Sequence, residues 1–396
     1  MKLQSQPDVI IVGAGASGLM CAIHAGYRGL RVLVLEKGPK AGLKILVSGG
    51  GRCNFTNIHA DPRKQFLSEN PHFCISAMSR YAPADFIDTV EAAGIAYHEK
   101  TLGQLFCDDS AKNIVGMLLD QCAAAGVEVR LRQHVTAISP VGDGGFSVVT
   151  DREKYTAGKV VIASGGLSLP KIATDLAFRT ANRLGLKVVA PRAALVPLTW
   201  NSDDKEKYAD LSGISLDARV SCRGASFREN ILFTHRGMSG PAMLQISSYW
   251  REGDSVLTDL LPDFDTAAWL ASERDANPQQ RIASLLKTRL PKRFVDTVAG
   301  DWFEDTKVGS CSPREVAGIG ALFNAWAFRP GGSEGYRTAE VTLGGIDTDE
   351  VSSKTFELKK YPGLFAIGEA LDVTGWLGGY NFQWAWASGW CCAQHL

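Results

Sequence analysis

The sequence predicts an α/β protein whose parallel sheet is built from two distant parts of the chain, with an inserted antiparallel β domain and a small helical subdomain between them. Three observations indicate this class. A strand, a glycine-rich turn, a helix and a second strand follow one another over residues 9–36. A second segment of strand and glycines lies over residues 364–390. Near Pro191 the pattern changes to short alternating runs, which are typical of antiparallel strands.

Composition excludes several classes of protein. The 396 residues include 42 basic and 42 acidic side chains, so no global field attracts nucleic acid or an anionic membrane, and any such partner must be bound locally. The nine cysteines form no C-x-x-C pair and show no zinc-type spacing with histidine. We therefore expect reduced thiols in a cytoplasmic protein, with no metal site and no membrane span.

The first segment has the pattern of a βαβ unit. After a buried strand over Val9–Val12, Gly13 permits a tight turn, and Gly15 lets the backbone approach a pyrophosphate at the helix N-terminus. Gly18 allows the helix to pack closely on the strand. Glu36 follows the second strand, where a carboxylate binds an adenosine ribose. The residues expected to bind the ADP half of a dinucleotide are Gly13, Gly15, Ala16, Ser17, Gly18, Glu36 and Lys37.

The C-terminal segment distinguishes FAD from NAD. A buried strand over Leu364–Ile367 ends at Gly368 and Glu369, and two glycines then open an apolar helix. An acid at the end of a strand suits a ribityl hydroxyl, and the positive end of a helix suits an electron-rich ring carbonyl, so this segment favours FAD. The expected cofactor residues here are Gly368, Glu369, Gly378, Gly379, Tyr380, Asn381 and Phe382.

The two segments together resemble the FAD-binding halves of glutathione-reductase-type flavoproteins. The resemblance implies a Rossmann-like FAD-binding domain with a third motif at Val160–Gly166, in which Ala163 and Gly165 border the cofactor and Ser164 replaces the commoner threonine. The chain near Val135 would flank the adenine. The expected domains are a discontinuous FAD-binding domain over 1–190 and 340–396, a β-rich substrate domain over 191–262 and 325–339, and a helical insert over 263–324.

Four further stretches, GLKILVSGGGRCNFTN, LFTHRGMSGP, GYRTAEVTLGGID and DVTGWLGGYNFQWAW, resemble the YhiN-like (BaiN-type) FAD-dependent oxidoreductases over nearly the whole chain. The match is close to the proteobacterial branch, which is linked to the synthesis of dihydrouridine in large-subunit ribosomal RNA. Other branches are linked to aminoacetone oxidation and to bile-acid transformation. The resemblance implies an FAD-dependent oxidoreductase with ribosomal RNA as its partner.

The glycine run in SGGGRCNFTN is expected to pass along the flavin, where side chains would collide with the ring. Gly49, Gly50 and Gly51 would give the clearance, and Lys44 and Arg52 would offset the charge of the phosphates or of the reduced flavin. Ser48 and Asn54 would donate hydrogen bonds. The alternative is an anion-binding glycine loop with no part in the chemistry.

Two residues are candidates for the proton donor that reduction of uracil requires besides a hydride. Cys53 could protonate the ring from beside the flavin, or it could be a small buried hydrophobic residue. His235 lies in FTHRGMSGP and could border a ligand, or it could be structural. The predicted catalytic set is therefore Cys53, His235 and Arg52.

Substrate contacts are expected from the middle of the chain. Arg236 could contact a substrate phosphate or a neighbouring carboxylate, and Arg337 is a candidate pocket residue. Trp376, before the C-terminal glycines, could stack on a base. Five basic residues between Arg281 and Arg293 could contact phosphates or could form a solvated helix face.

A second strand–GxGxxG–helix unit is missing, so NAD(P)H is expected as a transient reductant with ping-pong kinetics. Three functions stay open at this stage. The first is an NAD(P)H-dependent reductase of a ribosomal RNA uridine. The others are a small-molecule flavoenzyme, either an amine oxidase or an enone reductase, and a non-catalytic flavin-binding partner of another protein.

Overall fold

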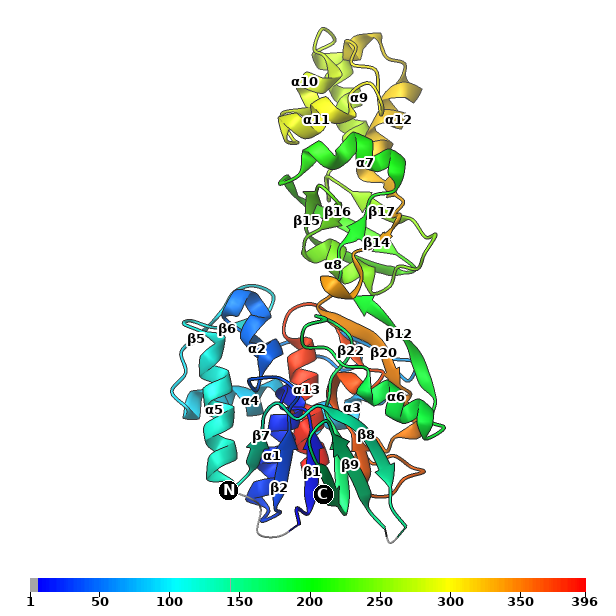
Figure 1. Ribbon diagram of the computed structural model, residues 1–396. Coiled ribbons are helices and arrows are strands. Elements are labelled where there is room, and N and C mark those ends of the chain that lie inside the picture. The colour runs from blue at the N-terminus through cyan, green and yellow to red at the C-terminus, as the bar shows by residue number, and fades with distance from the viewer. Residues whose placement is uncertain (1–5, 143) are drawn as a thin grey trace. The chain divides into compact units, whose positions relative to one another are not determined.

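The computed structural model describes residues 6–142 and 144–396, and the chain forms two compact units. The first unit combines the residues up to Arg192 with Val341–Leu396, and the second spans Ala193–Glu340. The first unit therefore carries both ends of the colour scale in Figure 1. The strands and helices expected as separate β-rich and helical parts lie together in the second unit, and their division into two domains stays a prediction.

A five-stranded parallel sheet forms the centre of the first unit, in the order β21-β11-β1-β2-β7. β1 pairs in parallel with β11 and with β2, so that Val9 lies opposite Lys159 on one side and Val32 on the other. All residues of β1 and β2 are buried, as expected for parallel strands covered on both faces. The strands are β1 (Val9–Val12), β2 (Val32–Leu35), β7 (Glu128–Arg130), β11 (Lys159–Ile162) and β21 (Leu364–Ala366).

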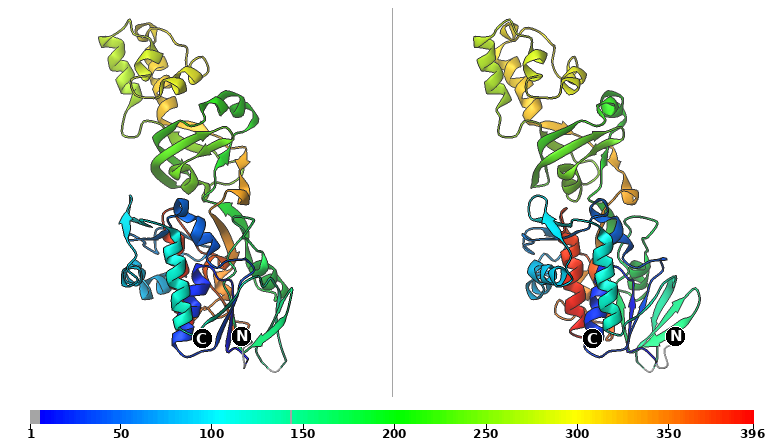
Figure 2. Two further views of the ribbon diagram at one scale, coloured as in Figure 1. Left: turned by 60° about the vertical axis from the view of Figure 1, so that its left-hand side comes forward. Right: turned by 90° about the vertical axis from the view of Figure 1, so that its left-hand side faces the viewer.

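Helices and a β-meander cover this sheet. Figures 1 and 2 show α13, α1 and α5 side by side on one face, with the antiparallel meander of β8, β9 and β10 on the other. α1 and α13 approach closely, because a Cβ on Gly389 would lie 2.5 Å from the carbonyl oxygen of Ser17. The elements are α1 (Ala16–Tyr27), α2 (Leu43–Val47), α3 (Ile75–Arg80), α4 (Pro83–Ala92), α5 (Ala111–Ala124), α6 (Leu176–Arg183), α13 (Tyr380–Ala393), β8 (Val135–Pro140), β9 (Phe146–Thr150) and β10 (Lys154–Ala157).

Three small sheets complete the first unit. One has the order β3-β6-β5, one pairs β22 with β4, and one pairs β12 with β20. Their strands are β3 (Asn54–Asn57), β4 (Phe66–Leu67), β5 (Tyr97–Glu99), β6 (Gln104–Cys107), β12 (Val188–Ala194), β20 (Val341–Ile346) and β22 (Thr374–Gly375). The parallel sheet with its helices and meander confirms the predicted α/β class.

The second unit contains a seven-stranded sheet in the order β18-β17-β14-β15-β16-β13-β19, whose neighbours pair antiparallel. Its core is aromatic: Phe233 stacks on Trp326 with the ring planes 4° apart. The strands are β13 (Leu198–Thr199), β14 (Ser215–Cys222), β15 (Ala225–Thr234), β16 (Gly237–Ser239), β17 (Val256–Asp259), β18 (Trp326–Phe328) and β19 (Gly332–Ser333).

Six α-helices lie in the described part of the second unit. Pro291 separates α10 from α11, as the sequence predicts, because a proline inside a helix removes a hydrogen bond. The helices are α7 (Ser202–Tyr208), α8 (Pro241–Ser247), α9 (Thr266–Ala276), α10 (Ile282–Leu286), α11 (Lys292–Val298) and α12 (Pro313–Asn324).

Candidate functional site

The glycines of the turn after β1 have two different roles. Gly13 has φ +113°, and a Cβ there would lie 2.4 Å from the carbonyl oxygen of Ala163. A Cβ on Gly18 would lie 2.0 Å from the carbonyl oxygen of Gly13, so the packing of the protein itself requires both glycines. A Cβ on Gly15 would meet nothing within 4 Å. Gly15 therefore borders open space at the N-terminus of α1.

The N-terminus of α1 is suited to an anion. Among the described residues, no side chain caps this helix end. The first turn of the helix, which includes Ala16 and Ser17, carries no acidic residue. The first amides of a helix point along its axis with no partner inside the helix, and the helix dipole adds positive potential there. Open space beside Gly15 leaves these amides accessible, as diphosphate binding requires.

Glu36 lies at a pocket that begins at this turn. Its carboxylate accepts the N–H of Ala14 at 2.8 Å and the N–H of Gly38 at 2.6 Å, and these bonds hold it beside the glycine turn. Lys37 donates to the carbonyl oxygen of Ala173, and burial lowers the pKa of its ammonium. The pocket is lined by Val12, Gly13, Leu35, Glu36, Lys37, Gln133, His134, Val135, Ser164, Ile172, Thr174 and Leu176.

Ser164 supplies a direct test of whether this pocket fits a polar ligand. Its hydroxyl is buried and has no hydrogen-bond partner among the residues that the structure describes. Buried polar groups are nearly always hydrogen-bonded, so a buried hydroxyl without a partner beside a pocket indicates a missing ligand or water. The pocket joins Gly13, Glu36, Lys37 and Val135, four of the residues that the sequence predicts to bind the ADP half of the cofactor.

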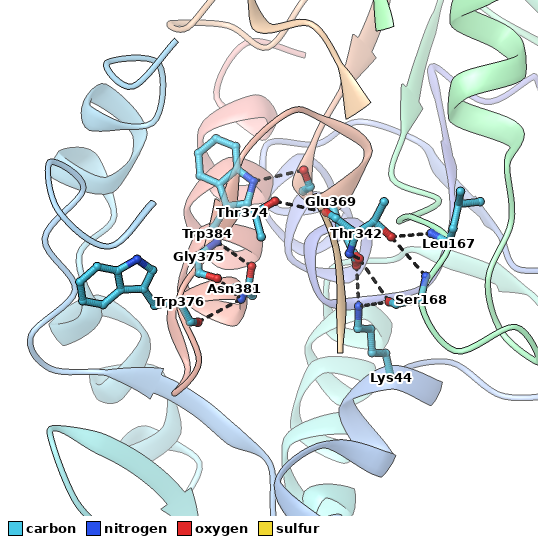
Figure 3. Close-up of polar contacts among 11 residues, drawn as sticks. Lys44, Leu167, Ser168, Thr342, Glu369, Thr374, Gly375, Trp376, Asn381 and Trp384 are labelled. Atoms are coloured by element: carbon cyan, nitrogen blue, oxygen red, sulfur yellow. Dashed lines mark hydrogen bonds and ion pairs between the residues drawn. The ribbon is translucent and has the colours of Figure 1, made fainter. Parts of the chain in front are cut away.

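Glu369 is the centre of a polar network that Figure 3 shows. Its carboxylate accepts from Lys44 Nζ at 2.6 Å and from the N–H of Thr342 at 2.8 Å. Ser168 contacts both charged groups, at 2.9 Å from Lys44 Nζ and 3.3 Å from Glu369 Oε1. The sequence predicts a ribityl contact for Glu369, and for Lys44 a role in offsetting the charge of the phosphates or of the reduced flavin. In the structure they form an ion pair across 325 positions of the chain.

Thr342 and Ser168 are network residues that the sequence analysis did not find. Thr342 Oγ1 accepts the N–H groups of Leu167 at 2.7 Å and of Ser168 at 3.2 Å. A Cβ on Gly166 would lie 2.5 Å from Thr342 Oγ1 and 3.1 Å from Glu369 Oε1, so Gly166 makes room for the network. The network thus links α2, the loop after β11, β20 and the C-terminal motif. A Cβ on Gly165, in the same loop, would meet nothing within 4 Å.

The C-terminal glycines lie against β3. A Cβ on Gly379 (φ +94°) would be 2.4 Å from the carbonyl oxygen of Thr56, and Asn57 Nδ2 donates to the carbonyl oxygen of Gly378 at 2.9 Å. Gly379 precedes α13, whose N-terminus has no side-chain cap among the described residues. The glycines therefore open an apolar helix, as the sequence predicts, and the contact of its positive end with a flavin ring stays a prediction.

Side chains of α13 fix the loop before it. Asn381 accepts the N–H of Gly375 at 2.8 Å and donates to its carbonyl oxygen at 2.9 Å, as Figure 3 shows. The indole N–H of Trp384 donates to the carbonyl oxygen of Gly368 at 3.1 Å. Phe382 stacks on Trp386 at 5.7 Å between ring centroids, Tyr380 is buried, and Gly368 (φ +64°) lies against Ser17.

The glycine run forms a left-handed turn. Gly49, Gly50 and Gly51 have φ of +56°, +67° and +87°, which disfavours other residues at all three positions. A Cβ on Gly50 or Gly51 would meet nothing within 4 Å, whereas one on Gly49 would lie 2.9 Å from the Phe106 ring. Arg52 is exposed.

The two polar side chains beside this turn make local contacts. Ser48 Oγ donates to the carbonyl oxygen of Ile45 at 2.8 Å. The amide of Asn54 lies 3.2 Å from the amide of Gln104, in the neighbouring strand. Ser48 therefore stabilises the end of α2, and Asn54 joins the turn to the β3-β6 pair.

Cys53 is completely buried. Burial raises the pKa of its thiol far above the usual range. Free cysteines are among the most buried residues and act as small hydrophobic groups, so this conformation favours the interpretation of Cys53 as a core residue over that of proton donor. All nine cysteines are free, and eight of them are buried.

His235 and Arg236 lie in the second unit, exposed in the turn between β15 and β16. The N–H groups of Arg236 and Gly237 donate to Thr234 Oγ1 and shape this turn. Trp376 is partly buried in the first unit, and its backbone N–H donates to the carbonyl oxygen of Gln65.

Most of the basic residues between Arg281 and Arg293 already have partners. Arg281 pairs with Asp305 at 2.8 Å, and Lys287 pairs with Asp296. Arg289 lies over the ring of Phe264 at 4.5 Å. Arg293 donates to the carbonyl oxygen of Ser212 at 2.8 Å. This run is therefore not an open row of phosphate contacts.

The described ranges contain neither a membrane-spanning helix nor a metal-binding cluster. No helix there is both long and apolar enough to cross a bilayer. No group of three or more histidine, cysteine, aspartate or glutamate side chains in residues 6–142 and 144–396 is arranged to hold a metal ion.

The parallel sheet, the uncapped N-terminus of α1, the pocket at Glu36 and the C-terminal motif define the class as FAD-dependent oxidoreductases with a Rossmann-type binding domain. Within this class, the chain belongs to the HI0933-like family, because it matches the HI0933-like protein Rossmann domain over residues 7–395.

Three relatives span nearly the whole chain. It is 49% identical to a ribosomal RNA dihydrouridine synthase of Escherichia coli (strain K12), over 98% of each chain. It is 45% identical to the Haemophilus influenzae protein of the same name, again over 98% of each. It is 26% identical to a 3-dehydro-bile acid delta(4,6)-reductase of Clostridium scindens, over 97% of each. The family that the motifs indicated is thus confirmed.

Proposed function

We propose that this protein is an FAD-dependent reductase that converts a uridine of large-subunit ribosomal RNA to dihydrouridine, with NAD(P)H as the transient reductant. The observation that carries the proposal is the 49% identity, over 98% of both chains, to a protein named ribosomal RNA dihydrouridine synthase. The second relative of that name, at 45% identity, supports it.

The chemistry is the reduction of a carbon–carbon double bond conjugated to a carbonyl. In uracil, one ring carbon takes a hydride and its neighbour takes a proton, so the double bond gains two hydrogens and the donor loses a hydride. The name of the Clostridium scindens relative describes reduction of double bonds in an oxidised steroid. Among the small-molecule alternatives, this relative favours an enone reductase over an amine oxidase.

FAD would supply the hydride when bound. The diphosphate would lie at the N-terminus of α1 beside Gly15, and the adenosine in the pocket of Glu36, Val135 and Ser164. The N-terminus of α13 would face the ring, and the glycines of the 49–51 turn would allow it to pass. Lys44, which donates hydrogen bonds to Glu369 and Ser168, would place a positive charge between the loop after β11 and the C-terminal motif.

The proton must come from an accessible group. Cys53 is the weakest of the three predicted catalytic residues, since it is completely buried. His235 is exposed and is the remaining acid of this set. A guanidinium group is a hydrogen-bond donor suited to anions, so the role of Arg52 would be to stabilise negative charge rather than to donate a proton.

Two experiments test this function. Mass spectrometry of ribosomal RNA from a deletion strain should show the loss of one dihydrouridine, and its return on complementation. Unchanged RNA would refute the proposed substrate.

Separately, NADH or NADPH should bleach the purified yellow protein anaerobically before RNA is added, with ping-pong kinetics. Rapid peroxide production from a small amine would favour an oxidase instead.

We place this reaction in the cytoplasm, where ribosomal RNA is made in bacteria. The nine free cysteines support a reducing compartment.

A further inference from the structure

The second unit contains two arginines that share one carboxylate. Arg236 Nη1 and Arg337 Nη2 each lie 3.6 Å from Glu334 Oε2. The Glu334 side chain is only 12% exposed, whereas those of Arg236 and Arg337 are 47% and 63% exposed. The carboxylate is therefore covered and the two guanidinium groups face solvent.

The short strand β13 determines this arrangement. It pairs with β16 on one side and with β19 on the other. Arg236 precedes β16, and its carbonyl oxygen accepts the N–H of Trp200 at 2.9 Å. Glu334 follows β19, and its N–H donates to the carbonyl oxygen of Pro197 at 3.0 Å. Arg337 is three residues beyond Glu334, so both cations are tied to one rigid part of the sheet.

The Glu334 carboxylate leaves N–H donors of both guanidinium groups without a hydrogen bond to the described residues. A separation of 3.6 Å is too long for a hydrogen bond, and neither guanidinium donates one to any residue that the structure describes. Each guanidinium has five N–H donors. Two positive charges against one negative charge leave a local excess of one, in a chain whose net charge is zero.

Other arginines of this unit differ in this respect. Arg228 contacts both Asp217 and Asp263 through hydrogen bonds, and Arg219 donates to Asp263 at 3.0 Å. Arg281 donates to Asp305 at 2.8 Å. Arg236 and Arg337 instead combine fixed backbones with free donors, which is the arrangement that binds a phosphate group bidentately.

We propose that Arg236 and Arg337 form a pair that binds a backbone phosphate of the RNA substrate. This inference rests on the proposed function, because it takes the partner to be RNA. Glu334 holds the two guanidinium groups side by side in the free protein, and the phosphate then replaces the solvent that faces them.

The test is the salt dependence of binding by the FAD-loaded protein to transcribed, unmodified large-subunit ribosomal RNA. Each phosphate contact contributes about 0.7 to 0.9 to the slope of log affinity against log salt. R236A and R337A should each reduce that slope by about one such contact. Between 50 and 200 mM salt, the loss of affinity should then be about threefold smaller than for the unchanged protein.

Two further variants separate recognition from structural support. E334Q removes the covered charge and leaves both cations, so it should tighten RNA binding. If the ion pairs serve only stability, E334Q should weaken binding as the arginine variants do, and the proposal fails. R236K keeps the charge and should retain the slope even if R236A folds poorly. R314A, at an exposed arginine of α12, is the matched control and should change nothing.

The failures of the two proposals are distinguishable. If the deletion strain lacks a dihydrouridine but R236A and R337A bind RNA with the unchanged slope, only the arginine pair is refuted, and an acidic protein surface becomes its better partner. If the deletion strain has normal ribosomal RNA, the proposed function fails whatever the slopes are.

Discussion

Replacing Gly15 by alanine should weaken FAD binding strongly while leaving the fold intact. The backbone at Gly15 has φ −85° and ψ −170°, which alanine adopts without strain, and its new Cβ would meet nothing within 4 Å. Alanine is a poorer N-cap than glycine, which destabilises the helix end. Alanine also lowers the conformational entropy of the unfolded chain, which stabilises the folded state by about 0.4–1 kcal/mol. The two effects offset each other. The free energy of unfolding of the apoprotein should therefore change by less than about 1 kcal/mol.

The cost should fall on the cofactor instead. The methyl group would occupy the space that a diphosphate needs, and overpacking of a filled site costs about 1–3 kcal/mol. That range corresponds to a roughly 5- to 150-fold rise in the Kd of FAD. Thermal unfolding of the apoprotein and titration with FAD, followed by flavin fluorescence, measure the two quantities separately.

Two other glycine substitutions serve as comparisons. Gly13→Ala should prevent folding, because its Cβ would lie 2.4 Å from a backbone oxygen at φ +113°. Gly116→Ala, inside α5 and equally open, should stabilise the apoprotein by about 0.5–1 kcal/mol without affecting FAD. If Gly15→Ala binds FAD normally, the diphosphate does not lie at this helix end and the reasoning is refuted.

Three further predictions follow from burial and charge. Cys53→Ala should keep RNA reduction within about threefold and lower stability by about 1 kcal/mol, since the thiol is a small buried group; a hundredfold loss of RNA reduction with normal flavin reduction would restore Cys53 as the proton donor. Lys44→Ala should cost about 1 kcal/mol in urea unfolding of the apoprotein by leaving the Glu369 carboxylate without its cation, and Glu369→Gln in that background should recover most of it; no recovery would mean that the pair is not coupled. Hydrogen bonds from Arg31 lower the pKa of the Asp8 carboxyl to about 2, below its value in the unfolded chain. The stabilisation that the Asp8–Arg31 pair gives the folded state is therefore present above about pH 4 and is lost as the pH falls toward 2. Because the pair is exposed, that loss should be small, and Asp8→Asn should remove this part of the pH dependence of the unfolding midpoint.

The parts of the fold that the sequence predicted well have local causes. The βαβ unit could be predicted because the glycine turn, the helix face and Glu36 lie within 30 residues of one another. The C-terminal strand and α13 could be predicted for the same reason, since a buried strand, two glycines and an apolar helix follow directly along the chain.

The site could be predicted only in part, because its remaining contacts join distant segments. Nothing in the sequence near Thr342 indicates that its hydroxyl accepts the N–H groups of Leu167 and Ser168. The ion pair of Lys44 with Glu369 likewise depends on how α2 and the end of the sheet meet. Ser164 was noticed as a departure from a motif, but its unsatisfied hydroxyl becomes visible only with the pocket around it.

Burial and charge neutralisation also depend on tertiary structure. Cys53 follows an exposed arginine and an exposed glycine turn, yet it is completely buried, because its own φ of +53° turns it into the core. The basic run at 281–293 resembles a phosphate-binding surface until Asp305 and Asp296 are placed beside it. Each of these partners lies outside the local pattern, where periodicity carries no information.

The first unit is built from two segments of the chain that the second unit separates, and this affects its biosynthesis. β21 completes the sheet beside β11, and α13 packs on α1, but both are translated after the whole of the second unit. The nascent chain therefore presents an incomplete nucleotide-binding fold, with an open strand edge, until residues 341–396 leave the ribosome. Completion of the flavin-binding unit must follow synthesis of this segment, and the contiguous second unit is free to fold first.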